Sequence, residues 1–107
     1  MAKKTETPRD GSLDSLIEAL KHGDANARWE AARALGALRD RRAVDPLLEA
    51  LNDPDPDVRR KVALSLAKTR DERAFAALQA CSEKDENLIV RWAASWSLGR
   101  FQERKSA

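Results

Sequence analysis

An internal repeat of 31 residues constrains the fold of this chain more than any other feature of its sequence. When residues 16–46 are aligned with residues 47–77, twelve of the 31 positions are identical without a gap, whereas chance would give about two or three. A third copy begins at Leu78 and, after one inserted residue within 82–89, returns to phase at an offset of 32. Short units repeated in tandem are typical of solenoids, in which each unit packs on its neighbours.

Each copy is predicted to form two amphipathic helices, because apolar residues recur at helical spacing and capping residues stand at the breaks. The composition agrees, since the chain has nine β-branched residues, no Tyr and 19 Ala, which favours helix over strand. Pro46 falls inside one helix and predicts a bend there without a break. The predicted first helices cover about 13–22, 41–52 and 72–82, and the second about 25–38, 56–69 and 87–101. The predicted N-caps are Ser12, Asp24, Asp40, Asp55, Asp71 and either Asp85 or Asn87.

The predicted fold class is all-α, a short right-handed α-solenoid of three two-helix repeats. A chain of 107 residues is long enough for one domain with a substantial core. We expect this domain over 12–101, a flexible N-terminal tail over 1–11 and a C-terminal tail over 102–107. The repeats should cover about 12–39, 40–70 and 71–101. Leucines expected to lie buried between the stacked helices are Leu20, Leu35, Leu51, Leu66 and Leu98.

A sequence motif joins the second helix of one copy to the first helix of the next. In the first copy it comprises Asp24, Arg28, Ala31, Ala32, Leu35 and Gly36, followed by Asp40, Ala43, Val44, Pro46, Leu47, Leu48, Ala50 and Leu51. Over about residues 13–101, this pattern resembles the HEAT-like repeat of the phycobilin-lyase type, which is also used in consensus-designed α-repeat proteins. The resemblance implies that the second helices line an inner, concave surface that binds other proteins. The sequence departs from the pattern at Ala67 in the middle copy, and at Ala27 and over 77–82 in the first and third copies. Departures in the first and third copies are typical of end repeats.

All three tryptophans of the chain fall on one predicted face of the second helices. The repeat register makes Trp29 and Trp92 equivalent, and places Trp96 one turn further along. Trp and Arg are enriched at the energetic centres of protein interfaces. The alternative is that the tryptophans fill the core between neighbouring helices. The residues predicted to bind a partner on this aromatic and basic face are Trp29, Arg33, Arg60, Lys61, Leu64, Trp92, Trp96 and Arg100.

Three arginines, Arg28, Arg59 and Arg91, recur at the same position of each copy. Asp40 and Asp71 also recur. We expect Arg and Asp side chains to form a hydrogen-bonded ladder along the stack, which would be structural and not part of a binding site.

The sequence contains no group of residues that predicts catalysis, a cofactor or a metal site. His22 stands alone near a helix end, and Cys81 aligns with the apolar Ala50, so we expect a small, buried thiol. The carboxylates within 53–57 predict a turn and an N-cap, since the segment lacks the glycine and distant Glu of a calcium loop. Deoxyhypusine hydroxylase, an iron enzyme of HEAT type, uses His-Glu pairs, and no such pair occurs here. We therefore predict a protein that is not an enzyme and has no cofactor.

The leading interpretation of the function is a scaffold or adaptor that binds another protein, whose identity the sequence does not give. Nucleic-acid binding is the first alternative, but Glu30 and Asp57 on the same face and a net charge of +2 argue against it. An accessory subunit of a chromophore lyase is the second, suggested by the family resemblance alone. Against this second alternative, the chain has no Cys or His predicted to face the concave surface, where a pigment would bind.

The end of the stack and the cell compartment give two further expectations. The third copy carries more apolar residues on its outer side than a terminal repeat usually shows, so we predict that Trp92 and Trp96 are covered by a partner or by a second copy in a homodimer. The sequence has no apolar run of the roughly 20 residues that span a bilayer and no signal-peptide pattern, so we expect a cytoplasmic protein without a membrane partner.

Overall fold

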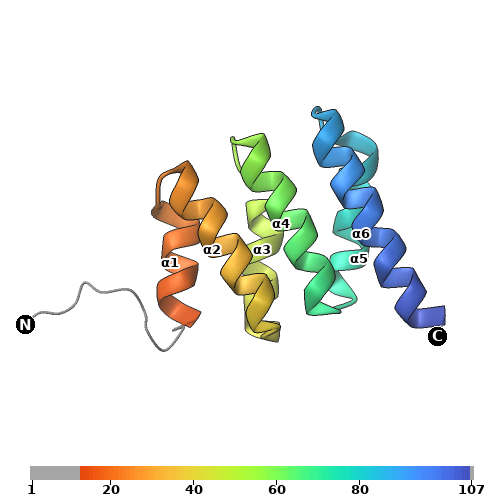
Figure 1. The fold of residues 1–107 in the computed structure, drawn as a ribbon, viewed down its shortest axis with the longest axis horizontal. Coiled ribbons are helices and arrows are strands. Elements are labelled where there is room, and N and C mark those ends of the chain that lie inside the picture. The colour runs from red at the N-terminus through yellow and green to blue at the C-terminus, as the bar shows by residue number, and fades with distance from the viewer. Residues whose placement is uncertain (1–12, 107) are drawn as a thin grey trace, which may run out of the picture.

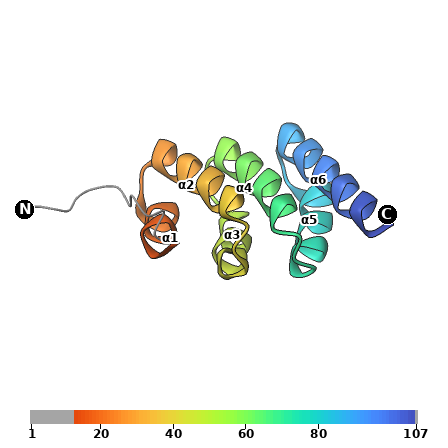
Figure 2. The ribbon, with the colours of Figure 1, turned by 60° about the horizontal axis from the view of Figure 1, so that its bottom comes forward.

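The computed structural model describes residues 13–106, with side chains to residue 100. Its elements form two layers, with α2, α4 and α6 side by side in one and α1, α3 and α5 in the other (Figures 1 and 2). No strand occurs in this part of the chain. The structure confirms the predicted all-α solenoid, while the predicted tail over 1–11 and the Ser12 cap lie outside the described residues. The elements are α1 (Leu13–His22), α2 (Ala25–Leu38), the 3-10 helix η1 (Arg41–Ala43), α3 (Val44–Ala50), α4 (Pro56–Thr69), α5 (Arg73–Lys84) and α6 (Leu88–Ser106).

The first helix of the middle repeat differs most from its predicted form. A single bent helix over 41–52 was expected, but the segment divides into η1 and the seven-residue α3. Pro46 is the third residue of α3. In that first turn an N–H has no partner within the helix, so a proline is tolerated there without a kink. The last helix also differs from its predicted form, because α6 continues to Ser106, beyond the predicted helix end at 101.

Small side chains allow the second helices to pack closely on one another. The Ser65 hydroxyl of α4 donates to the Ala32 carbonyl of α2 at 2.8 Å, and the Ser97 hydroxyl of α6 donates to the Ala63 carbonyl of α4 at 3.1 Å. Gly36 lies against α4 so closely that an added Cβ would stand 2.7 Å from the Ser65 Cβ. Each second helix is therefore held to the next through its backbone.

The predicted leucine core is right at three of its five positions. Leu20, Leu35 and Leu66 are buried as expected. Leu51 and Leu98 are only half-buried and pack against the edge of the core. Leu51 follows the short α3 as its C-cap, whereas Leu98 lies on the last helix of the stack.

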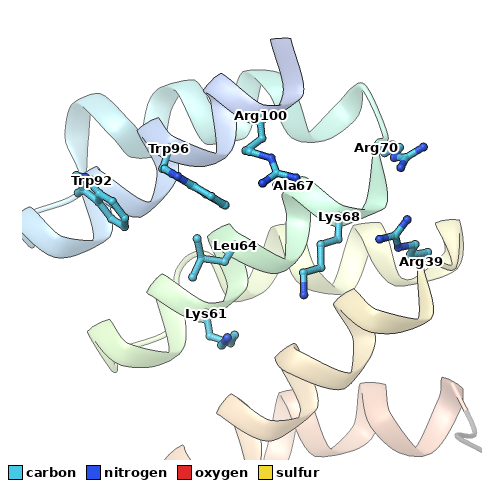
Figure 3. A pocket seen from close by; sticks show the side chains of 9 residues that line it. All are labelled: Arg39, Lys61, Leu64, Ala67, Lys68, Arg70, Trp92, Trp96 and Arg100. Carbon is cyan, nitrogen blue, oxygen red and sulfur yellow. The ribbon is translucent and has the colours of Figure 1, made fainter. Parts of the chain in front are cut away.

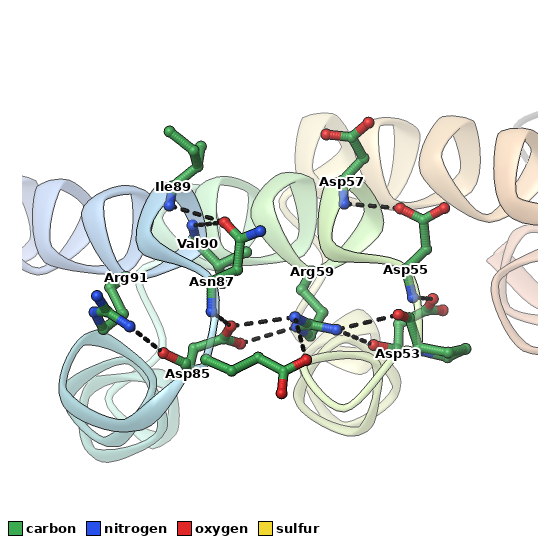
Figure 4. A network of polar contacts seen from close by, with 11 residues as sticks. Asp53, Asp55, Asp57, Arg59, Asp85, Asn87, Ile89, Val90 and Arg91 are labelled. Atoms are coloured by element: carbon green, nitrogen blue, oxygen red, sulfur yellow. Dashed lines mark hydrogen bonds and ion pairs between the residues drawn. The ribbon is translucent and has the colours of Figure 1, made fainter.

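A ladder of arginine contacts ties the loops of successive repeats together (Figure 4). Arg28 Nε donates to Asp53 Oδ2 at 2.7 Å, and Arg59 Nε donates to Asp85 Oδ2 at 2.9 Å, each time reaching the loop of the following repeat. The recurring Asp40 and Asp71 are not the acids of this ladder. They accept from the backbone amides of Arg42 and Arg73 at the starts of the first helices. None of the eight predicted binding residues takes part in these ladder contacts.

Candidate functional site

A pocket of about 350 Å³ opens between α4 and α6 on the layer of second helices (Figure 3). Five of the eight residues predicted to bind a partner line it: Lys61, Leu64, Trp92, Trp96 and Arg100. We call this hollow the α4/α6 pocket. Its remaining lining residues are Arg39, Ala67, Lys68 and Arg70.

Two tryptophans of α6 form one wall of the α4/α6 pocket. Trp92 and Trp96 lie one turn apart, with ring centroids 6.4 Å apart and ring planes inclined by 24°. They are 59% and 44% exposed, so they are not core filler between helices. The Arg100 guanidinium lies 5.2 Å from the centre of the Trp96 ring, within range for a cation–π contact. The wall is thus a large apolar surface that reaches solvent.

The opposite wall comes from α4, where Lys61, Leu64 and Lys68 follow one another at helical spacing. Burial lowers the pKa of Lys61, and the nearby charges of Arg60, Lys68 and Arg33 lower it further. Removing this ammonium from water and placing it among like charges both disfavour its charged form. The α4 wall of the pocket therefore holds a partly buried ammonium close to other cations.

The arginines Arg39 and Arg70 complete the rim of the pocket, and they were missing from the predicted site. Both are helix C-caps in the left-handed conformation, with φ of 54° and 58°. The sequence does show that the same residue type, Arg, follows the second helix in both the first and the second repeat, 31 residues apart. The side of the stack to which a C-cap side chain turns is set by the helix end, and the periodicity does not reveal it.

A second hollow of about 410 Å³ lies beside the pocket, between the N-terminal halves of α2 and α4. Trp29 and Arg60 line it together with the acids Glu30, Asp55 and Asp57. We call it the α2/α4 hollow.

The arginines Arg33 and Arg60 beside the α2/α4 hollow form ion pairs with carboxylates. Arg33 binds Glu30 at 3.0 Å, and the Arg60 Nε lies 3.7 Å from Asp57 Oδ1. The ammonium of Lys61 lies 4.8 Å from the centre of the Trp29 ring and so connects the hollow with the pocket. The structure therefore places the eight predicted residues on the layer of second helices, a surface that we call the second-helix face. Five of them line the α4/α6 pocket and two line the α2/α4 hollow, while Arg33 lines neither and pairs with Glu30.

Residues elsewhere in the chain offer little chemistry. Burial raises the pKa of the Cys81 thiol to about 11, with a further contribution from Asp85, so the thiol is protonated at neutral pH. His22 is well exposed, with Nε2 lying 3.5 Å from a carboxylate oxygen of Glu18. Within residues 13–106, no group of three or more His, Cys, Asp and Glu is placed to hold a metal ion. In the same part of the chain, no helix has the length and apolar character needed to cross a bilayer.

Comparison with known families gives a match over the whole described region. A family model described as HEAT repeats matches residues 13–106. The comparison with curated proteins finds no match.

Proposed function

This chain belongs to the HEAT-repeat family, and on that premise we propose that it is a non-enzymatic scaffold that binds a partner protein through its second-helix face. HEAT repeats commonly serve as scaffolds for protein interactions. The scaffold residues of this chain, the Arg ladder and the small residues between helices, are engaged within the stack. The residues of the second-helix face are available to a second molecule.

The observation that carries this proposal is the exposure of Trp92 and Trp96 next to the α4/α6 pocket. Exposed aromatic side chains that lie together are unfavourable on a free surface, because water orders around them without compensation. The same side chains in a pocket make strong anchors for a partner, since they bury a large area at a small cost in conformational entropy. A pocket bordered by two indoles thus favours binding over a purely structural role.

The geometry of the second-helix face also argues against two alternative functions, nucleic-acid binding and an accessory role in a chromophore lyase. A nucleic acid would use the cations and tryptophans of the pocket, but Glu30 and Asp57 border the next hollow along the face. The phycobilin-lyase likeness of the motifs would favour an accessory role in a chromophore lyase. For that role we would expect a Cys or His at the groove, whereas Cys81 lies on α5 beside Leu48 and His22 ends α1.

Site-specific photo-crosslinking tests the proposal. A benzophenone amino acid replaces Trp96 on the second-helix face or, as the control, the exposed Gln79 on α5 in the other layer. In extracts of the native host, we expect a discrete protein adduct from position 96 and none from position 79. Equal adducts from both positions, or adducts with nucleic acid alone, would refute the proposal.

A further inference from the structure

The α4/α6 pocket is lined by cations and has no carboxylate among its lining residues. Its charged side chains are Arg39, Lys61, Lys68, Arg70 and Arg100. In the part of the chain that the structure describes, no carboxylate forms an ion pair with Arg39, Lys61, Lys68 or Arg100. An anion bound beside Lys68 and Arg100 would therefore gain favourable contacts without breaking an ion pair of either side chain.

The size and apolar wall of the pocket restrict the shape of that anion. A volume of about 350 Å³ is at the small end for ligand sites and suits one or two side chains. Trp92, Trp96 and Leu64 provide apolar surface beside the cations. Figure 3 shows Trp96 of α6 and Leu64 of α4 facing one another across the pocket, with Arg100 and Lys68 further toward the C-terminal helix ends. A complementary ligand thus combines an apolar group with negative charge beside it.

The positive surface ends where the α2/α4 hollow begins. There Glu30 and Asp57 neutralise Arg33 and Arg60. A nucleic-acid strand that left the pocket along the face would meet arginines that are already paired with carboxylates, so its phosphates would gain little there. A short acidic segment does not have this problem, because its charges need not continue at regular intervals.

We propose that the α4/α6 pocket binds a short acidic segment of a partner protein, with a large apolar side chain of that segment seated against Trp92 and Trp96. This inference rests on the proposed scaffold function and adds the chemistry of the partner. Carboxylates on either side of the apolar residue pair with Lys68 and Arg100. A second copy of this chain is a poor occupant, because a two-fold contact through the pocket would bring the same cations together.

A peptide-binding experiment on the full chain tests the inference. The probe is a fluorescein-labelled peptide of about ten residues with Asp and Glu around a central Leu-Phe pair, a length typical of linear recognition segments. Matched probes replace the acids with Lys or the Leu-Phe pair with Ser-Ser, and a single-stranded oligothymidine of similar length is the fourth. Anisotropy gives each Kd, and quenching of the tryptophan emission reports contact with the wall of the pocket.

We expect only the acidic peptide with Leu-Phe to bind and to quench the tryptophan emission. Charge reversal at Lys68→Glu with Arg100→Glu should raise its Kd by about tenfold or more, and Trp92→Ser should also weaken binding. The control Lys84→Glu reverses one charge on α5, outside the pocket, and should leave Kd unchanged, whereas the single reversal Lys68→Glu should already raise it. Circular dichroism checks that each variant is folded.

Several outcomes would overturn the inference. Equal binding of the Lys probe, an unchanged Kd in the reversed variant, or no binding of the acidic probe would show that the pocket does not select acidic segments. Tighter binding of oligothymidine, lost steeply with salt, would assign the pocket to nucleic acid, and a doubled mass by light scattering that Trp92→Ser abolishes would assign it to a second copy. A protein adduct from position 96 combined with failure of the acidic probe would leave the scaffold proposal standing and refute this inference alone.

Discussion

The middle and C-terminal repeats place equivalent residues in unequal surroundings. Arg59 of α4 reaches Asp85 in the following repeat, while its counterpart Arg91 on α6 donates only to the Asp85 carbonyl of its own loop, at 2.7 Å. Ala63 is fully buried against α6, whereas the equivalent Ser95 is exposed. The residue type at a repeat position therefore specifies how it can pack, and the neighbour decides whether that packing occurs.

The two tryptophans Trp29 and Trp92 also occupy equivalent positions in unequal surroundings. In the first two repeats, the far side of each second helix is covered by the next second helix. On α6 no further repeat follows within the described residues, so Trp92 has one side open to solvent while the equivalent Trp29 is half-buried and packs against the core. The place of a repeat in the stack thus decides how much of an equivalent tryptophan stays exposed to solvent.

We expect the largest difference in stability between variants of the two equivalent arginines, Arg59 and Arg91. Arg59→Ala should lower the free energy of unfolding by about 3–5 kcal/mol, because it leaves the nearly buried Asp85 without its partner. Arg91→Ala should cost only about 1–2 kcal/mol, since it removes one hydrogen bond to a carbonyl. Urea denaturation followed by circular dichroism measures both. If both variants lose the same free energy of unfolding, the ion pair between Arg59 and Asp85 does not stabilise the stack more than the single hydrogen bond of Arg91 does.

A second pair compares the leucines at the same repeat position. Leu66→Ala empties a fully buried site and should cost about 2–5 kcal/mol. Leu98→Ala removes a half-buried side chain at the last helix and should cost about 1–2 kcal/mol, because the site partly refills with water and nearby side chains. Thermal melts of the two variants at one protein concentration provide the comparison. A larger loss from Leu98→Ala would contradict the proposed register of the repeats.

The glycines of the first and third repeats should respond in opposite directions to the same substitution. Gly36→Ala forces a methyl group to within 2.7 Å of Ser65 and should destabilise the chain by about 1–3 kcal/mol. An added Cβ at Gly99 meets nothing within 4 Å. Gly99→Ala should therefore stabilise α6 by about 0.5–1 kcal/mol through helix propensity. Differential scanning calorimetry reads both, and a stabilised Gly36→Ala variant would disprove the close contact of α2 with α4.

Much of the fold could be predicted because several independent sequence features recur in each copy and indicate the same structure. The same two-helix unit is indicated by the 31-residue period, which relates Leu35 to Leu66, by the helical spacing of apolar residues within each copy, and by the caps Asp24 and Asp55. The division of one first helix into η1 and α3 could not be predicted. Short 3-10 turns are frequent at helix starts, and the helical spacing of apolar residues does not distinguish such a turn from the first turn of an α-helix.

The candidate site could be predicted only in part. Helical spacing places Trp92, Trp96 and Lys61 on one face, but periodicity does not show whether a neighbour covers that face. The pocket also depends on Arg39 and Arg70, whose placement follows from left-handed backbone at two helix ends. Non-glycine residues rarely adopt this conformation, so the residue type at these two positions did not indicate it.

The smallest expected effect concerns two capping aspartates, one between the first and second repeats and one between the second and third. Hydrogen bonds from the Arg73 side chain and its backbone amide lower the pKa of Asp71 from 3.8 to about 2. Hydrogen bonds from the Arg42 side chain, with its backbone amide, also lower the pKa of Asp40. The side chain of Asp71 is 6% exposed and that of Asp40 is 27% exposed. The deeper aspartate should therefore make the stronger contribution to stability.

A carboxylate whose pKa is lowered by folding stabilises the native state above its unfolded pKa, and this stabilisation disappears as the pH falls through the folded value. Asp71→Asn should thus reduce the free energy of unfolding by about 1 kcal/mol at pH 7, allowing for the solvent around Arg73. The difference from the parent chain should shrink between about pH 4 and pH 2, the window set by the two pKa values of Asp71. Asp40→Asn, the matched control, should show a smaller difference over the same pH series of urea titrations. If the two variants lose equal stability, burial between repeats does not strengthen this cap.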